Sequence, residues 1–449
     1  MRFPRRKHLP NFCPPHPSWP LIRLAARLVP LVLRLKYGQS SPRVSRKELK
    51  VLRGFRGCRL VLTPNHPDKA DPAVIGWLAA RAGLERPYVL ANRAQFDGWW
   101  GFKGRLMQRL GAYSIARGTV DRSSFKTTRQ LLSDPQQANQ LLIYPEGGNY
   151  SRSESVFPFL PGVFGLIAKA QEELSDKQSA ASIAPSPRSG LFVVPIALNY
   201  VVHDRHVESK IDAALRDLEH YVGLEDGAPQ PRAQRIVALG ERMLSLAEGN
   251  EGLPVVVSLS PFERLERMQL FLLEKVESRL GFSHSERQKQ AQLRLSVPER
   301  TRKVIEAFLR ISEEDYVPGT AYEETLMRRD LASAENLRLE LERLQNWMDV
   351  QRGYLQEHGS VNHLVDIVRR FEWEIYGKVH LTVRRRCLVR LATPIEVRPF
   401  TEHASGAKKE TREAQVLALT HQVEASVRHL LLPSSLSHGS RSKPRAKSP

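Results

Sequence analysis

The chain has 449 residues, 41% of them hydrophobic, so it can bury a large core and exceeds the size of one small domain. A formal net charge of +20 predicts a polyanionic partner, either a nucleic acid or an anionic membrane surface. The three cysteines, Cys13, Cys58 and Cys387, are widely separated, which argues against a disulfide framework or a metal site and favours a reducing compartment. P-loop, dinucleotide and Gly-x-Ser-x-Gly fingerprints are absent from the sequence.

The first fifty residues are strongly basic, with twelve Lys or Arg and a single acid, Glu48. Within them, residues 19–37 form an apolar stretch whose arginines fall on one side of a helix, as is typical of a helix lying in the membrane interface. Pro30 and the arginines make it a poor membrane span, and it lacks the features of a secretory signal. The alternative is a helix packed on the protein's own core. No recognised nucleic-acid motif accompanies the basic residues, so the membrane is the favoured polyanion, although a nucleic-acid partner stays open.

A histidine and a carboxylate follow the short apolar run 60–63. His66 precedes Pro67, which biases it towards extended backbone, and Asp71 comes five residues after the histidine. This pair can form a general base, because the carboxylate holds one ring nitrogen while the other takes a proton from a hydroxyl. Asp71-Pro72 also resembles an N-cap followed by proline, which predicts a helix over 73–82 ended by Gly83. Asp71 could therefore serve as a cap alone, or could fill both roles.

Strand and helix patterns alternate through the central part of the chain. Strands are expected at 59–63, 87–91, 113–116, 140–144 and 191–199, and helices at 125–132 and 162–173, among others. We therefore expect an α/β fold with a largely parallel sheet flanked by helices. Because sites in such sheets gather at the carboxyl ends of strands, His66, Arg117 and Glu146 should meet at one edge. A Ser-, Ala- and Pro-rich stretch at 175–190 predicts a surface loop.

The remainder of the chain is charged and mostly helical in pattern. Apolar residues at helical spacing predict packed helices between residues 203 and 376, with no visible chemistry; His203 and His206 match no metal-ligand signature. A strand at 386–397 and a helix at 409–432 are expected to return to the sheet. The expected organisation is the basic segment 1–50, the α/β core 51–202, a helical insertion or accessory region 203–384, a returning strand and helix 385–432, and a disordered basic tail 433–449.

Four segments of the core resemble, in order, the motifs of the glycerolipid acyltransferases, the 1-acylglycerol-3-phosphate acyltransferase family. They are Asn65-His66-x4-Asp71, the segment 111–117 ending in Arg117, Tyr144-Pro145-Glu146-Gly147, and the proline-containing strand 193–197. The resemblance covers residues 51 to 200, less than half of the chain. It implies transfer of a fatty acyl group from coenzyme A or acyl carrier protein to a lipid hydroxyl, with no cofactor and no metal, at the cytoplasmic face of a membrane.

The resemblance also implies roles for individual residues. His66 would be the general base and Asp71 would orient it. Acceptor binding would fall to a set of polar and glycine residues around the motifs, namely Asn65, Arg117, Arg122, Glu146, Gly147, Gly148 and Arg152. Where the family usually has Thr-Arg after Glu-Gly, this chain has Gly148-Asn149, and either Arg117 or Arg122 could bind a phosphate. The alternatives are a phosphate-free lipid acceptor and a catalytically silent, membrane lipid-binding protein.

Overall fold

The computed structural model describes most of the chain between residues 12 and 431. The described ranges are 12–84, 87–96, 102–115, 121–148, 153–181, 189–224, 230–283, eight separate positions between 285 and 308, 319–348, 360–398 and 409–431. The predicted basic tail 433–449 lies outside them, as do residues 182–188 of the predicted loop 175–190.

The core is an eight-stranded, mostly parallel sheet with the order β1-β7-β6-β2-β5-β3-β4, to which β8 adds by pairing with β6. Strands β6, β2, β5, β3 and β4 run parallel to one another, and β7 runs antiparallel to β6. The strand bounds are β1 Gln39–Val44, β2 Arg59–Pro64, β3 Pro87–Asn92, β4 Ala112–Ile115, β5 Gln140–Leu142, β6 Leu191–Val202, β7 Arg385–Leu391 and β8 Ile395–Glu396. The α/β fold with a largely parallel sheet is thus confirmed.

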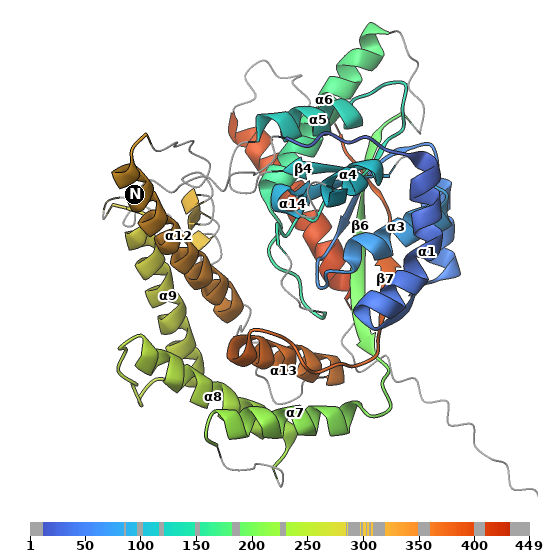
Figure 1. The fold of residues 1–449 in the computed structure, drawn as a ribbon. Helices are drawn as coiled ribbons and strands as arrows, with labels where there is room; N and C mark the ends of the chain where they lie inside the picture. Colours follow the sequence, from blue (N-terminus) through green and yellow to red (C-terminus); the bar gives the residue numbers. More distant parts are fainter. Residues whose placement is uncertain are drawn as a thin grey trace, which may run out of the picture.

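Helices cover both faces of this sheet (Figure 1). On one face, α1, α2 and α3 enclose a core that includes Leu60, Leu62 and Val194. On the other face, α5, α6 and α14 pack over Val61 and Val193. Neighbouring residues of one strand therefore point to opposite cores, as the alternation of a pleated strand requires. The bounds of these helices are α1 Trp19–Tyr37, α2 Arg46–Gly54, α3 Asp71–Ala82, α5 Arg122–Leu132, α6 Pro161–Ala180 and α14 Lys409–Leu430; η1 Arg93–Phe96 and α4 Phe102–Arg109 lie between β3 and β4.

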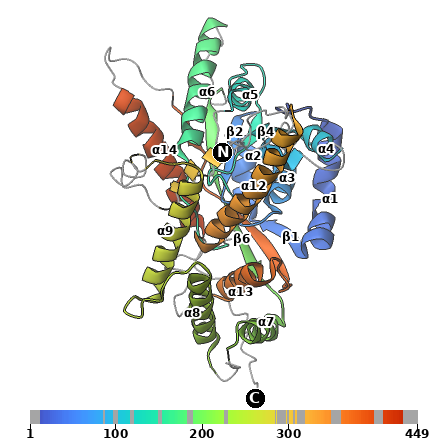
Figure 2. The same cartoon turned by 60° about the vertical axis from the view of Figure 1, so that its left-hand side comes forward.

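A second group of helices extends away from the sheet as an arm (Figure 1). It comprises α7 Val207–Tyr221, α8 Arg232–Asn250, α9 Pro261–Arg279, α12 Ala321–Met348 and α13 Val361–Tyr376. In both views α13 lies between helices α7 and α8 of the arm and the lower ends of β6 and β7 (Figure 2). The helical pattern predicted between residues 203 and 376 is found in the described part of this region, and its apolar repeats form two cores of their own.

Helix α1 occupies the residues expected from the sequence, and the chain stays helical through Pro30. Proline in a helix interior removes a hydrogen bond, and we attribute its tolerance here to packing: Ala26, Val29 and Leu33 are buried on this helix. Its opposite side leaves leucines exposed. Among the described residues, no helix combines the length and apolar character needed to cross a membrane.

Other differences from the expected elements concern their ends. Helix α6 continues to Ala180, so the first residues of the predicted loop 175–190 are helical. Strand β6 extends to Val202, three residues further than expected. The extension is stabilised by β7, whose residues pair with β6 up to Val202 and Arg385.

Candidate active site

The loop after β2 is held in place by a buried asparagine. Strand β2 is buried throughout and ends at Pro64, and Asn65 follows it with no exposed surface. The Asn65 amide donates to the carbonyl of Leu198 over 3.2 Å, and its oxygen accepts from the Leu198 N–H over 2.7 Å. Both ends of this side chain are therefore bonded to β6, and Asn65 fixes the loop on the sheet instead of facing a substrate.

His66 and Asp71 form a close pair at the carboxyl edge of the sheet. His66 Nδ1 lies 2.7 Å from Asp71 Oδ2. The carboxylate is fully buried, and the histidine side chain is 12% exposed. In a neutral imidazole that donates from Nδ1, Nε2 is the unprotonated nitrogen. The arrangement can therefore accept a proton at Nε2 while the buried carboxylate stabilises the resulting positive charge.

Asp71 is bonded on every side. Besides His66, its Oδ2 accepts from the Asp68 N–H over 2.9 Å, and its Oδ1 accepts from the Tyr200 hydroxyl over 2.6 Å. Burial raises the pKa of Asp71, while the hydrogen bonds from His66 and Tyr200 lower it in part. Tyr200 reaches the site because β6 extends beyond the end of β2.

The prediction that Asp71 is the N-cap of the following helix is wrong. Asp71 is the first residue of α3 and Pro72 the second, while the N-cap position is Ala70, which has no capping side chain. The carboxylate is instead directed to His66, Asp68 and Tyr200. Gly83 ends the helix in the left-handed conformation, as expected.

The segment after β5 supports the histidine from two directions. The Tyr144 ring stacks on the His66 ring with centroids 3.9 Å apart and an interplanar angle of 18°. Glu146 is 3% exposed; its Oε1 accepts from the His66 N–H over 2.7 Å and its Oε2 from the Phe157 N–H over 2.9 Å. Glu146 thereby joins the histidine loop to the chain that leads into α6. Its position favours a role in shaping the site over direct contact with a glycerol hydroxyl.

Gly147 closes a tight turn with φ +75°, in the left-handed region that glycine adopts at little cost. Its N–H donates to the Tyr144 carbonyl over 3.1 Å, and a β-carbon here would lie 2.6 Å from Leu160 Cδ1. Gly148 follows and is buried. The close approach at Gly147 is to this chain's own Leu160, which accounts for the glycine without a ligand.

Of the three arginines predicted to bind the acceptor, the structure describes only Arg122. Arg117 and Arg152 lie outside the described residues. Arg122 is exposed at the first residue of α5. The N-cap of this helix is Asp121, which also pairs with Arg93 at the start of η1. No described contact joins Arg122 to the His66–Asp71 pair.

A charged layer behind the pair was not predicted from the sequence. Arg385, at the start of β7, lies 2.7 Å from Asp68 Oδ2 and places its guanidinium 5.4 Å from the Tyr200 ring centre. Asp366 of α13 lies 3.9 Å from Arg385, and Arg369 follows on the same helix. These residues come from segments about 300 positions apart, so no local spacing marks them; only the pairing of β6 with β7 brings them together.

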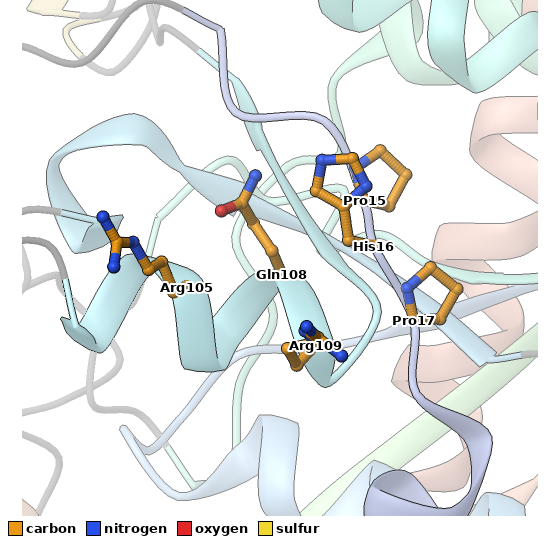
Figure 3. Close-up of a pocket in the computed structure, with 6 residues that line it drawn as sticks. All are labelled: Pro15, His16, Pro17, Arg105, Gln108 and Arg109. Atoms are coloured by element: carbon orange, nitrogen blue, oxygen red, sulfur yellow. The ribbon is translucent and has the colours of Figure 1, made fainter.

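A separate pocket lies on the surface near the amino terminus (Figure 3). It has a volume of about 580 Å³ and is lined by Pro15, His16, Pro17, Arg105, Gln108 and Arg109. None of these residues is among those described around the His66–Asp71 pair. In the part of the chain that the structure describes, no group of three or more His, Cys, Asp or Glu side chains could hold a metal ion. His203, one of the two histidines weighed as ligands, instead lies 2.8 Å from the hydroxyl of Ser40.

Comparison with known proteins agrees with this geometry. A family model described as Acyltransferase matches residues 44–199, which run from the end of β1 through most of β6 and include His66, Asp71 and Glu146. No curated protein matches the chain. The matched segment includes the four motif-like segments in order. Residues 44–199 therefore form an acyltransferase domain of the glycerolipid acyltransferase family.

Proposed function

We propose that the protein transfers a fatty acyl group from a thioester to the free hydroxyl of a lysophospholipid such as 1-acylglycerol-3-phosphate, in phospholipid biosynthesis. The single observation that carries the proposal is the buried Asp71 bonded to Nδ1 of His66 at the sheet edge. Membership of the domain in the acyltransferase family supports the reaction class.

The reaction requires one proton to be moved twice. Nε2 of His66 takes the proton of the acceptor hydroxyl as the oxygen attacks the thioester carbonyl carbon. The tetrahedral intermediate then expels the thiolate, which recovers the proton from Nε2 and leaves as the free thiol of the donor. General base catalysis of this kind contributes about 10²- to 10⁴-fold. Holding donor and acceptor together contributes more, since well-oriented groups reach effective molarities of about 10⁵–10⁸ M.

The surroundings of the pair suit this task. Asp71 fixes the imidazole tautomer and offsets the charge that forms on protonation. Tyr144 stacks on one face of the His66 ring and Asp71 holds its Nδ1, while Glu146 fixes the main-chain N–H of the same residue. The donor would be acyl-coenzyme A or an acyl carrier protein, and the thioester needs no cofactor.

The surface around α1 supports a peripheral or monotopic attachment to the cytoplasmic face of an anionic membrane. Large apolar side chains are exposed on α1 and on the nearby α4: Leu24, Leu28, Leu31, Val32 and Leu35, with Phe102 and Leu106. Basic residues of the same helices accompany them, Arg23, Arg27 and Arg34 on α1 and Arg105 and Arg109 around the pocket of Figure 3. Apolar burial and attraction to anionic lipid would act together at this surface.

An acyl-transfer assay tests the proposed reaction. Purified protein is incubated with labelled acyl-coenzyme A or acyl carrier protein and separate acceptors: 1-acylglycerol-3-phosphate, lysophosphatidylcholine and monoacylglycerol. We expect labelled product with a phosphate-bearing acceptor and a loss of at least about 10²-fold in turnover for His66→Ala.

The matched control is His421→Ala, which removes an exposed histidine from α14 and should keep full turnover. Circular dichroism and the melting temperature establish that both variants are folded. Transfer by folded His66→Ala at a rate near that of the natural sequence would contradict the mechanism. Absence of transfer by the natural sequence with every pair of substrates would favour the silent lipid-binding alternative.

A further inference from the structure

Helix α13 of the arm is fastened directly to the catalytic edge of the sheet. Asp366 Oδ2 accepts from the Ser153 N–H over 3.0 Å, and Asn362 Oδ1 accepts from the Val202 N–H over 2.7 Å. At the start of the helix, the hydroxyl of Ser360 and the amide of Asn362 bond Glu154. The arm is therefore hydrogen-bonded both to the segment that follows the Glu146 turn and to the end of β6.

One face of α13 is turned towards the loop that holds His66 and Asp71. Asp366, Arg369 and Trp373 are spaced by three and four residues, so they share this face. Asp366 lies near Arg385, which is bonded to Asp68. Trp373 lies under Lys69, with the ammonium nitrogen 5.6 Å from its ring centre. On α13, Arg369 therefore lies between Asp366, which is near the ion-pair partner of Asp68, and Trp373, which contacts Lys69 of the loop.

Arg369 is half-buried and has no hydrogen-bond or ion-pair partner among the described residues. The neighbouring carboxylates are already bonded elsewhere. Asp68 accepts from Ala70 and Arg385, and Asp366 accepts from Ser153. Both oxygens of Glu372 accept from main-chain N–H groups of residues 380 and 381. Within the described part of the chain, these carboxylates therefore leave the Arg369 guanidinium without a hydrogen bond.

The Arg369 guanidinium is close to that of Arg385, and the charges of Asp366, Asp68 and Glu372 offset this repulsion in part. Burial, and next the charge of Arg385, lower the pKa of Arg369 to about 10, so it remains charged at neutral pH. A half-buried guanidinium close to a second one is costly to keep. Binding of a dianion would relieve both the repulsion and the missing hydrogen bonds.

We infer that Arg369 is a substrate-binding residue that the helical arm supplies to the acyltransferase domain, and that it binds a phosphate group beside the His66 loop. The planar guanidinium presents a fork of donors that matches phosphate oxygens. The inference rests on the proposed function for the identity of the substrate. The phosphate belongs either to the lysolipid acceptor or to the acyl donor, and the two sources are separated by experiment.

Steady-state kinetics of Arg369→Ala give the main test. With 1-acylglycerol-3-phosphate we expect the apparent acceptor KM to rise about 10- to 100-fold, as for loss of hydrogen bonds to a charged group. If the phosphate is that of the acceptor, the KM of the acyl donor should stay unchanged. Arg369→Lys should recover only part of the loss, because one ammonium cannot replace the fork. A rise confined to the KM of acyl-coenzyme A would support the phosphate site and identify the donor as its source.

A matched control is Arg216→Ala, which removes the same charge from an exposed position on α7. It should leave all kinetic constants unchanged. If Arg369 merely balances nearby acids, Arg369→Ala should lower the melting temperature and leave both KM values as they were. That outcome would overturn the inference.

Binding of sn-glycerol 3-phosphate provides a readout that does not depend on turnover. The compound should raise the melting temperature of the natural sequence and of Arg216→Ala, but much less that of Arg369→Ala. Equal stabilisation of all three proteins, together with unchanged KM values, would refute the phosphate site even if acyl transfer is confirmed. Stabilisation that depends on Arg369 in a protein without turnover would instead keep the phosphate site and reject the proposed reaction.

Discussion

Two tyrosines lie beside the His66–Asp71 pair and differ in what their hydroxyls do. Tyr200 donates to Asp71, whereas the hydroxyl oxygen of Tyr144 is buried without a hydrogen-bond partner among the described residues. Burial raises the pKa of both phenols well above the usual value, so both are neutral at neutral pH. The same replacement by phenylalanine should therefore have different consequences at the two positions.

Tyr200→Phe should move the acid limb of the pH–rate profile upwards. The Tyr200 hydroxyl lowers the pKa of Asp71, so its loss lets the carboxyl take up a proton at higher pH, and a protonated Asp71 cannot stabilise the imidazolium. The measurement is turnover at saturating substrate across pH 4–8. An unshifted acid limb would show that Tyr200 does not tune the pair.

Tyr144→Phe should leave turnover within about twofold of the natural sequence. The ring that stacks on His66 is kept, and the variant removes a buried hydroxyl that lacks a partner, so the free energy of unfolding should stay equal or rise by about 1 kcal/mol. Urea unfolding and the acyl-transfer assay check the two parts. A fall in turnover of tenfold or more would reveal that the hydroxyl contacts substrate.

How much of the site can be predicted from the sequence depends on how far apart its residues lie along the chain. His66 and Asp71 are five residues apart, so their pairing follows from a local pattern. Tyr200 and Arg385 could not be foreseen, because they reach the site only through the extension of β6 and its antiparallel pairing with β7. The capping prediction for Asp71 fails for the same reason. Its Tyr200 hydrogen bond spans 129 positions, while capping is a local rule.

At the scale of elements, strand positions were predicted better than element ends. The apolar runs of β2 and β3 mark where they begin, but β6 continues past Asn199 because β7 supplies partners there. Helix α6 runs to Ala180, through residues whose amino-acid composition alone predicts a loop. Tertiary pairing and packing thus decide the ends, and neither is visible in a short window.

The junction of β6, α7 and β7 depends on Asp204. This side chain accepts from Lys210 Nζ over 2.8 Å, from the His206 N–H over 3.0 Å and from the Arg384 N–H over 3.1 Å. The Lys210 hydrogen bond is the largest of the influences that lower the pKa of Asp204 from 3.8 to about 2. A carboxyl with a lowered pKa stabilises the fold above its ordinary pKa, and that contribution is lost as the pH falls towards the folded value.

Asp204→Asn should therefore destabilise the protein at neutral pH and flatten its acid dependence between pH 4 and 2. The measurement is the free energy of unfolding in urea at a series of pH values. Asp217→Asn, at an exposed position of α7, should follow the natural sequence throughout. Identical pH dependence in the Asp204 and Asp217 variants would contradict the assignment.

At the scale of the whole molecule, the exposed leucines of α1 define the face expected to meet the membrane. Deleting the helix would also uncover the core that Val29 and Leu33 fill, so substitutions on the exposed side are the cleaner test. Leu28→Gln, Leu31→Gln and Leu35→Gln together should weaken binding to phosphatidylglycerol vesicles at least about tenfold, since each buried leucine contributes about 1.5–3 kcal/mol.

The control for that variant is Val255→Gln with Val257→Gln, which removes exposed apolar side chains from the arm. Vesicle co-sedimentation at low and high salt measures the effect. High salt should weaken the natural protein only in part, because screening leaves the apolar contribution intact. Equal binding by the α1 variant and the natural sequence would place the contact on another surface.

The pairing of Val202 with Arg385 has a consequence for how this architecture can vary. The whole arm departs and returns at two neighbouring positions of one antiparallel ladder, as the turn of a hairpin does. Lengthening such a connection costs little, about 0.6 kcal/mol for each doubling of its length. Helices could therefore be added to or removed from the arm's outer part while the strand register stays fixed. A scaffold of this kind can exchange its substrate-facing helix without rebuilding the sheet that holds the histidine.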